Sequence, residues 1–260
     1  MTRKGFLIDT SLCTGCRGCQ VACKQWNKLP AGASVNRGSY ENPPQLTPQL
    51  FNQIHFVESE KDGAMQWLFL NRRCMHCAEA GCIKVCPSAG ALYHTPEGMV
   101  AYNRDKCTEC HYCVNACPFD VPRYDAENRV TKCHACSDRI ASGLLPACAK
   151  GCPTGALQFG DRAQLLSKAK SSGKPVYGEN DLGGTGVLYL LSDTAHASGL
   201  PENPAIPTSI FLWKDVIKPF GILGFWGAIG AVVLHYVTVG PKRLEEDEST
   251  AKQNEGGKEL

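Results

Sequence analysis

Short apolar runs broken by polar and turn-forming residues fill the first part of the chain, and this pattern predicts short strands more than long helices. Residues 5–10 predict a strand that leads into the first cysteines, and residues 54–57 and 66–70 predict two more. The apolar runs 91–94 and 99–102 flank Thr-Pro-Glu-Gly, which is typical of a β-hairpin turn. The pattern therefore indicates a fold of small α and β elements.

The pattern changes towards the C-terminus. Residues 161–170 predict an amphipathic helix, and residues 171–210 are linker-like. From Pro219 to Pro241 the chain has 23 residues without Asp, Glu, Lys or Arg, and about 20 apolar residues span a bilayer core. A buried helix of a soluble domain is the alternative, but a lone apolar helix at this end of the chain has no core to enter. We therefore predict one transmembrane anchor over 211–241.

All 16 cysteines fall into four groups of four, each beginning with a C-x2-C pair. Groups one and three have the spacing x2, x2, x3, group two has x2, x4, x3, and group four has x2, x11, x3. Proline follows the last cysteine in every group except the first. The groups are Cys13, Cys16, Cys19 and Cys23; Cys74, Cys77, Cys82 and Cys86; Cys107, Cys110, Cys113 and Cys117; and Cys133, Cys136, Cys148 and Cys152.

The close spacing of groups one and three is the bacterial ferredoxin pattern for [4Fe–4S] clusters. Thiolates are soft ligands that suit iron–sulfur clusters. Zinc ribbons use pairs of C-x2-C without a third close cysteine, and disulfide frameworks are typical of short secreted domains, so both alternatives are disfavoured. We expect four [4Fe–4S] clusters and no three-iron cluster, because every group keeps four cysteines.

The four groups form an internal repeat. Groups two and four share the sequel Cys-Pro followed by Gly-Ala-Leu, and groups one and three share Cys-Thr-x-Cys. The short hairpin joins groups two and three into one unit, so groups four and one must close the other, with residues 156–159 pairing against 6–8. We predict an α+β fold of two interleaved ferredoxin-like (βαββαβ) domains. The boundaries are 1–30 and 123–170 for the outer domain, 31–73 for an insertion, 74–122 for the inner domain, 171–210 for a linker or docking segment, 211–241 for the anchor and 242–260 for a polar tail.

In a ferredoxin pair, the fourth cysteine of each group binds the neighbouring cluster. This rule predicts the ligands of four clusters, named A to D. Cluster A takes Cys13, Cys16, Cys19 and Cys152; cluster B takes Cys133, Cys136, Cys148 and Cys23; cluster C takes Cys74, Cys77, Cys82 and Cys117; and cluster D takes Cys107, Cys110, Cys113 and Cys86.

The formal net charge of +2 argues against nucleic acid as a partner. Four oxidised clusters at about −2 each would change it to about −6. Basic residues near the groups are expected to offset this charge, although any one of them could be an ordinary solvated residue; they are Arg72, Arg73, Lys84, Lys132 and Arg139. The histidines inside the groups are expected to donate hydrogen bonds to cluster sulfurs rather than bind iron; they are His76, His111 and His134.

Residues 13–27, 86–91 and 146–156 closely resemble the β subunit of membrane-bound respiratory formate dehydrogenase, a four-cluster subunit of the molybdopterin oxidoreductase family. Residues 212–214 and 235–241 continue the resemblance into the anchor. The resemblance implies a non-catalytic electron-transfer subunit. A separate molybdenum or tungsten bis-pterin subunit would oxidise formate, and electrons would pass through A, B, C and D to a membrane cytochrome b that reduces quinone.

Other functions remain open. The chain could be the equivalent subunit of a hydrogenase or a sulfur-compound reductase, a free-standing membrane-anchored ferredoxin, or a structural protein that binds zinc. The N-terminus lacks the apolar run of a secretory signal. The resemblance implies that the cluster domain is exported folded with its partner and faces the periplasm, while the tail stays in the cytoplasm.

Small or polar residues recur along one face of the anchor at spacings of three and four; they are Gly221, Gly224, Ala228, Ala231, His235 and Thr238. Small residues let another helix approach closely in lipid. We therefore predict that Gly224→Leu with Ala228→Leu releases the membrane cytochrome during detergent purification and leaves the clusters intact. A complex that survives these substitutions contradicts this role.

Overall fold

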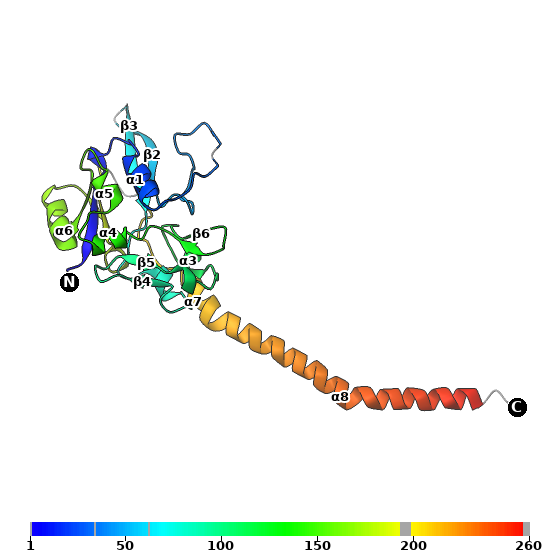
Figure 1. The fold of residues 1–260 in the computed structure, drawn as a ribbon. Helices are drawn as coiled ribbons and strands as arrows, with labels where there is room; N and C mark the ends of the chain where they lie inside the picture. The colour runs from blue at the N-terminus through cyan, green and yellow to red at the C-terminus, as the bar shows by residue number, and fades with distance from the viewer. Residues whose placement is uncertain (1, 34, 62, 193–198, 257–260) are drawn as a thin grey trace. The chain divides into compact units, whose positions relative to one another are not determined.

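The chain divides after Pro207 into an N-terminal unit that holds every cysteine and a C-terminal helical unit. The structure is a computed structural model, and it describes residues 2–33, 35–61, 63–192 and 199–256. Figure 1 shows the order of the elements along the chain. The mixture of short strands and short helices agrees with the predicted α+β class.

A four-stranded sheet forms the base of the N-terminal unit. Its strands, in order across the sheet, are β8 (Leu157–Asp161), β1 (Lys4–Asp9), β10 (Val187–Leu190) and β9 (Val176–Tyr177). Strand β1 is antiparallel to β8, with Phe6 opposite Phe159 and Ile8 opposite Leu157. The predicted pairing of the strand after group four with the strand before group one is therefore confirmed.

The segment expected to be a linker supplies two strands of this sheet, so that expectation is wrong for residues 176–190. Strand β10 runs parallel to β1, with Phe6 opposite Val187. All four residues of β10 are buried, and a strand covered on both faces has a continuous apolar run instead of an alternating one. Its short Val-Leu-Tyr-Leu run gives little periodicity, and its partner lies near the other end of the unit.

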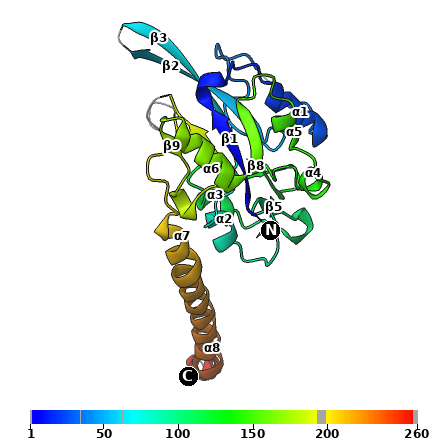
Figure 2. The same cartoon turned by 90° about the vertical axis from the view of Figure 1, so that its left-hand side faces the viewer.

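The two faces of the sheet have different neighbours, because successive side chains of a strand point to opposite sides. Phe6 and Ile8 belong to the apolar core that includes cysteines of groups one and four. Leu7 packs on the other face with Leu165 of α6 (Arg162–Ser171). Figure 2 shows α6 lying across the strands. The predicted amphipathic helix is thus confirmed, and it covers the sheet on the side away from the cysteines.

Three two-stranded hairpins and several short helices complete the unit. The predicted strands at 54–57 and 66–70 are parts of one longer hairpin, whose tip projects beyond the sheet in Figure 2. The predicted hairpin around residue 97 is also present. The hairpins are β2 (Asn52–Lys61) with β3 (Ala64–Arg73), β4 (Leu92–His94) with β5 (Val100–Tyr102), and β6 (Arg123–Tyr124) with β7 (Val130–Thr131). The remaining helices are α1 (Gly18–Trp26), α2 (Gly81–Lys84), α3 (Tyr112–Asn115), α4 (Ser137–Ala141), α5 (Ala147–Lys150) and the 3-10 turns Thr10–Leu12, Arg104–Lys106 and Asp181–Gly183.

The C-terminal unit is helical from Thr208 to Gly256. It consists of α7 (Thr208–Leu212), a π-helical turn (Trp213–Ile217) and α8 (Lys218–Gly256). Within the described residues, Thr208–Gly240 is the one helical stretch long and apolar enough to cross a membrane. Its large side chains, such as Phe220 and Leu223, are exposed. This segment coincides with the predicted anchor, and lipid is a favourable environment for such a surface.

Candidate metal centres

Each cysteine group has the same local fold around its third cysteine. That cysteine is the second residue of a short helix in every group, and the fourth cysteine follows four residues later. The pairs of helix and third cysteine are α1 with Cys19, α2 with Cys82, α3 with Cys113, and α5 with Cys148. Four residues of helix rise about 6 Å, so the fourth cysteine is carried away from the first three. The x3 spacing therefore directs it towards a different site.

The C-x2-C pair that opens each group also has a common backbone shape. The residue before the second cysteine is left-handed in all four groups, with φ of +64° at Gly15, +49° at His76, +58° at Glu109 and +60° at Ala135. A left-handed conformation costs roughly 1–2 kcal/mol for residues other than glycine. Groups two, three and four have a residue other than glycine at this position. The backbone is therefore folded to bring the first two thiols of each group to one side.

The structure brings the cysteines of groups one and four together. A small cavity of about 30 Å³ is lined by Cys13, Cys16 and Cys19 of group one and by Cys152 of group four. Conversely, Cys23 of group one lies beside three cysteines of group four, namely Cys133, Cys148 and Cys136. Each group thus sends its fourth cysteine to the first three of the other group.

Groups two and three exchange their fourth cysteines in the same way. Cys117 of group three lies beside the first three cysteines of group two, which are Cys74, Cys77 and Cys82. Cys86 of group two lies beside those of group three, which are Cys107, Cys110 and Cys113. All sixteen predicted site residues therefore occur in four sets, and each set takes three members from one group and one from another.

The chemistry of these sets fits an iron–sulfur cluster. Burial and neighbouring thiols raise the pKa of Cys113 to about 11 and that of Cys19 to about 12. Four such thiolates need a cationic centre to stay ionised together. No disulfide joins any of the sixteen. Among the described residues, no three His, Cys, Asp or Glu side chains converge on the position of a single metal ion, so the sets suit a larger core better than one zinc ion.

The four sets also form a row. Cys19 of the first set interacts with Cys148 of the second. Cys133 of the second interacts with Cys74 of the third, and Cys82 of the third interacts with Cys113 of the fourth. Adjacent sets therefore approach each other through their cysteines.

Polar side chains donate to cysteine sulfurs along this row. Asn71 Nδ2 lies 3.2 Å from Cys19 Sγ, and Tyr124 Oη lies 3.1 Å from Cys113 Sγ. Neither residue carries a sequence signal that points to a cluster, because Asn71 lies in a strand and Tyr124 lies outside the cysteine groups. They become identifiable only from the tertiary structure.

Two of the five basic residues selected from the sequence reach sulfur atoms. Arg73 lies within 3.3 Å of Cys133 Sγ and Cys148 Sγ, and Lys132 Nζ lies 3.8 Å from Cys74 Sγ. The other three have different surroundings: Arg72 is half-buried, Lys84 pairs with Glu79 at 2.7 Å, and Arg139 donates to the Leu145 carbonyl at 2.6 Å. Charge compensation is therefore concentrated at two buried positions.

One of the three histidines contacts a cysteine sulfur among the described contacts. His76 Nε2 lies 3.6 Å from Cys133 Sγ. Burial, together with the charges of Lys132 and Arg73, holds the pKa of His76 well below its usual value. His111 instead stacks on Tyr124 with ring centroids 3.7 Å apart. The expectation of a hydrogen bond to sulfur is met at His76.

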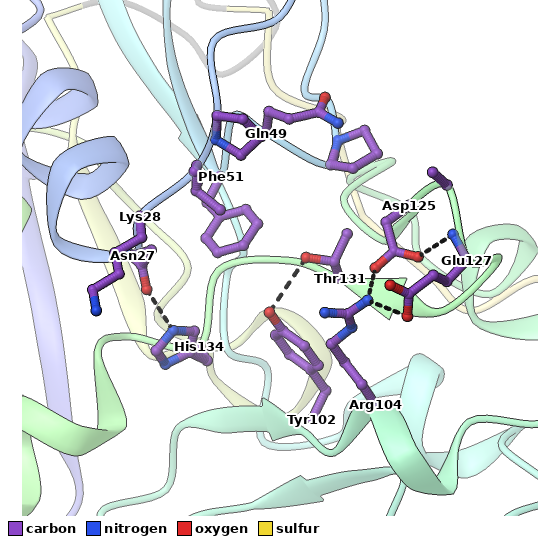
Figure 3. A pocket seen from close by; sticks show the side chains of 14 residues that line it. Asn27, Lys28, Gln49, Phe51, Tyr102, Arg104, Asp125, Glu127, Thr131 and His134 are labelled. Carbon is purple, nitrogen blue, oxygen red and sulfur yellow. Dashed lines mark hydrogen bonds and ion pairs between the residues drawn. The ribbon is translucent and has the colours of Figure 1, made fainter.

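The third histidine, His134, faces a pocket of about 450 Å³ (Figure 3). Its Nε2 donates to Asn27 Oδ1 at 2.8 Å, and Asn27 Nδ2 donates to the Cys23 carbonyl at 2.8 Å. Elsewhere in this pocket Arg104 pairs with Asp125 and Glu127. The polar groups labelled in Figure 3 thus largely satisfy one another, and His134 supports a cysteine through Asn27 instead of contacting sulfur itself.

The sequence matches three described protein families. Two matches are to a 4Fe-4S dicluster domain, over residues 12–91 and 65–162. The third is to the transmembrane region of formate dehydrogenase N, over residues 206–249.

Similar proteins occur in several bacteria. The iron-sulfur subunit of the nitrate-inducible formate dehydrogenase of Escherichia coli K12 is 40% identical, over 93% of this chain and 87% of that protein. The formate dehydrogenase iron-sulfur subunit of Haemophilus influenzae is 41% identical, over 93% and 82%. A hydrogenase-2 operon protein of Escherichia coli O157:H7 is 30% identical, over 84% and 81%.

The hydrogen bond from Tyr124 to Cys113 gives a testable prediction. Tyr124→Phe removes a donor that stabilises the reduced, more negative state of the cluster at Cys113. A loss of about 1 kcal/mol lowers the equilibrium constant for its reduction about fivefold. EPR-monitored redox titration measures this change, with the exposed Tyr93→Phe as the control. Equal midpoint potentials in wild type and Tyr124→Phe would contradict the role of this hydrogen bond.

Proposed function

Because the chain belongs to the family of formate dehydrogenase iron–sulfur subunits, we propose that the clusters held by its four sets of cysteines carry electrons from a formate-oxidising subunit towards the membrane. The chain is an electron-transfer subunit with four [4Fe–4S] clusters. When bound, each cluster accepts and releases one electron. The protein itself holds the clusters in a row and provides the anchor.

The observation that carries this proposal is the continuous row of cysteine sets. Cys19 and Cys148, Cys133 and Cys74, and Cys82 and Cys113 are neighbours between successive sets. A protein that merely stored metal or used metal to stiffen its fold would not need its sites to be neighbours, one after another. Adjacent ligands shorten the path between one cluster and the next, which is what an electron relay requires.

We assign the cluster ligands from these sets. The assignment is supported by the cavity that groups one and four share and by the neighbours of Cys23, Cys86 and Cys117. Cluster A takes Cys13, Cys16, Cys19 and Cys152; cluster B takes Cys133, Cys136, Cys148 and Cys23; cluster C takes Cys74, Cys77, Cys82 and Cys117; and cluster D takes Cys107, Cys110, Cys113 and Cys86.

The same exchange of cysteines supports two interleaved ferredoxin-like domains. The outer domain takes residues 1–30 and 123–170 and the inner domain takes 74–122, with 31–73 inserted between them. The pairing of β1 with β8 supports the joining of the two parts of the outer domain. The β4–β5 hairpin supports the joining of groups two and three in the inner domain. The outer domain also gains β9 and β10, which extends its boundary beyond residue 170.

The partners follow from the two ends of this relay. At the electron-donating end we propose a catalytic subunit with molybdenum or tungsten bound by pterin. At the other end we propose a membrane cytochrome b that receives electrons for quinone, held beside the anchor 211–241. The cluster domain would lie in the periplasm and the tail 242–260 in the cytoplasm.

The equivalent role in a hydrogenase is the second candidate. It is supported by the 30% identity with the hydrogenase-2 operon protein. The identity with that protein is lower than the 40% identity with the formate dehydrogenase subunit of Escherichia coli K12. Residues 206–249 also match the transmembrane region of formate dehydrogenase N, so formate is favoured as the source of electrons.

Purification in detergent tests this function. We expect a pterin-containing large subunit to co-purify with the chain, and anaerobic addition of formate to produce the EPR signals of reduced clusters. Hydrogen gas serves as the control reductant. Reduction by hydrogen but not by formate would favour the hydrogenase role, and purification of the chain alone would favour a free-standing ferredoxin.

The ligand assignment predicts that Cys23→Ala damages the cluster held by Cys133, Cys136 and Cys148. The iron content should fall by about one quarter. The EPR signal that disappears should be the one lost in Cys136→Ala. Cys16→Ala is the matched control, because it removes a ligand of cluster A. If Cys23→Ala and Cys16→Ala abolish the same signal, Cys23 binds the cluster of its own group and the exchange is wrong.

A further inference from the structure

Two chain segments each place a positive side chain beside a cysteine of the other segment. This happens where the proposed ligands of cluster B (set B) approach those of cluster C (set C). Arg73 precedes Cys74 of set C, and its Nη2 lies 3.3 Å from Cys133 Sγ of set B. Lys132 precedes Cys133, and its Nζ lies 3.8 Å from Cys74 Sγ. The residue in front of each cysteine therefore directs its positive charge at the cysteine of the other set.

Arg73 contacts a second sulfur of set B as well. Its Nη1 lies 3.3 Å from Cys148 Sγ, and its guanidinium carbon lies 3.9 Å from the centre of the Phe6 ring. A planar guanidinium suits two acceptors at once, which a lysine ammonium does not. Arg73 thus spans two ligands of one cluster while its backbone leads directly into a ligand of the next.

His76 adds a hydrogen-bond donor at the same place. Its Nδ1 accepts from the Val100 N–H at 3.0 Å, so the ring proton lies on Nε2, 3.6 Å from Cys133 Sγ. Lys132 Nζ donates to the Val100 carbonyl at 2.6 Å and to the Cys133 carbonyl at 2.9 Å. Val100 of β5 therefore orients both side chains towards the sulfurs.

The two cations at this junction are deeply buried. The exposed fractions are 3% for Arg73 and 2% for Lys132. Among the described residues, neither forms an ion pair with a carboxylate within 4.0 Å. Burying an unpaired charge is costly, so the neighbouring cysteine thiolates are the anions that balance them. Their charge therefore acts on the clusters with little screening by solvent.

We propose that Arg73, Lys132 and His76 form the electron-transfer junction between the two cluster pairs and raise the reduction potentials on both of its sides. This inference rests on the ligand assignment given under the proposed function. With the clusters bound, one electron would pass from the cluster held by Cys133 to the cluster held by Cys74, so the first would be oxidised and the second reduced, and no bond would be broken. A reduced cluster carries one more negative charge than an oxidised one. A nearby cation therefore stabilises the reduced state more.

The reciprocal arrangement has a purpose beyond charge balance. If one cation acted on one side alone, its cluster would become a trap for the electron. With Arg73 and His76 acting at Cys133 and Lys132 acting at Cys74, both potentials rise together. The free energy of electron transfer between the two cluster pairs then stays close to zero in either direction.

The test is EPR-monitored redox titration of the purified complex carrying Arg73→Gln or Lys132→Met. Arg73→Gln keeps a hydrogen-bond donor and removes the charge. It should lower the equilibrium constant for reduction of cluster B at least about tenfold, or about 59 mV for one electron. Lys132→Met should have the corresponding effect on cluster C. Each variant should change the other clusters less.

Arg72→Gln is the control, because Arg72 precedes Arg73 in the same strand and the described contacts to cysteine sulfurs are made by Arg73. It should change the four potentials much less than Arg73→Gln does. Arg73→Lys, which keeps the charge, should restore most of the potential that Arg73→Gln loses. Unchanged potentials of clusters B and C in Arg73→Gln and Lys132→Met would overturn the proposal. So would an equal shift in Arg72→Gln.

The test separates this inference from the ligand assignment. The signals of clusters B and C are identified by their loss in Cys23→Ala and Cys117→Ala. If those losses do not match Cys136→Ala and Cys77→Ala, the assignment has failed. If they match and the potentials do not move, the junction has failed. If Arg73→Gln does not retain iron, Lys132→Met decides the matter, and loss of iron in both would make these side chains structural supports and overturn the proposal.

Discussion

Mutual repulsion among buried thiolates is the constraint on which the rest of this structure depends. Sixteen cysteines lie in a unit of about 200 residues, and burial alone already raises the pKa of Cys19 and Cys113. Iron supplies most of the compensating charge. The protein supplies the remainder through a few donors, namely Asn71, Tyr124 and the buried Arg73 with Lys132. Most of the fold is accordingly short connections that hold cysteines at fixed spacing.

The features that could be predicted from the sequence are those set by short-range spacing. The proposed exchange of fourth cysteines rests on the x3 spacing and the repeat, and the pairing of residues 156–159 with 6–8, which the structure has, followed from the same repeat. The hairpin around residue 97 followed from its turn residues. Each of these depends on a local pattern or on the repeat, so a single sequence contains the necessary information.

The features that could not be predicted depend on contacts between distant segments. Strand β10 has a short apolar run whose partner lies about 180 residues earlier. Strand β3 looked like part of an insertion, yet Asn71 and Arg73 on one of its faces donate to sulfurs of sets A and B. The left-handed turns at His76, Glu109 and Ala135 use residues that give no such signal. For β10 and β3, the partners are segments or side chains far away in the sequence, which the local pattern does not identify.

The position of β1 has a consequence for the order in which the protein is made. The strand belongs to the first ten residues, but its two neighbours, β8 and β10, are synthesised last in this unit. The inner cysteines, from Cys74 to Cys117, are complete on the ribosome well before Cys133 to Cys152 emerge. The inner cysteines are therefore complete before the outer ones, and the sheet around β1 cannot close until β8 and β10 have been made.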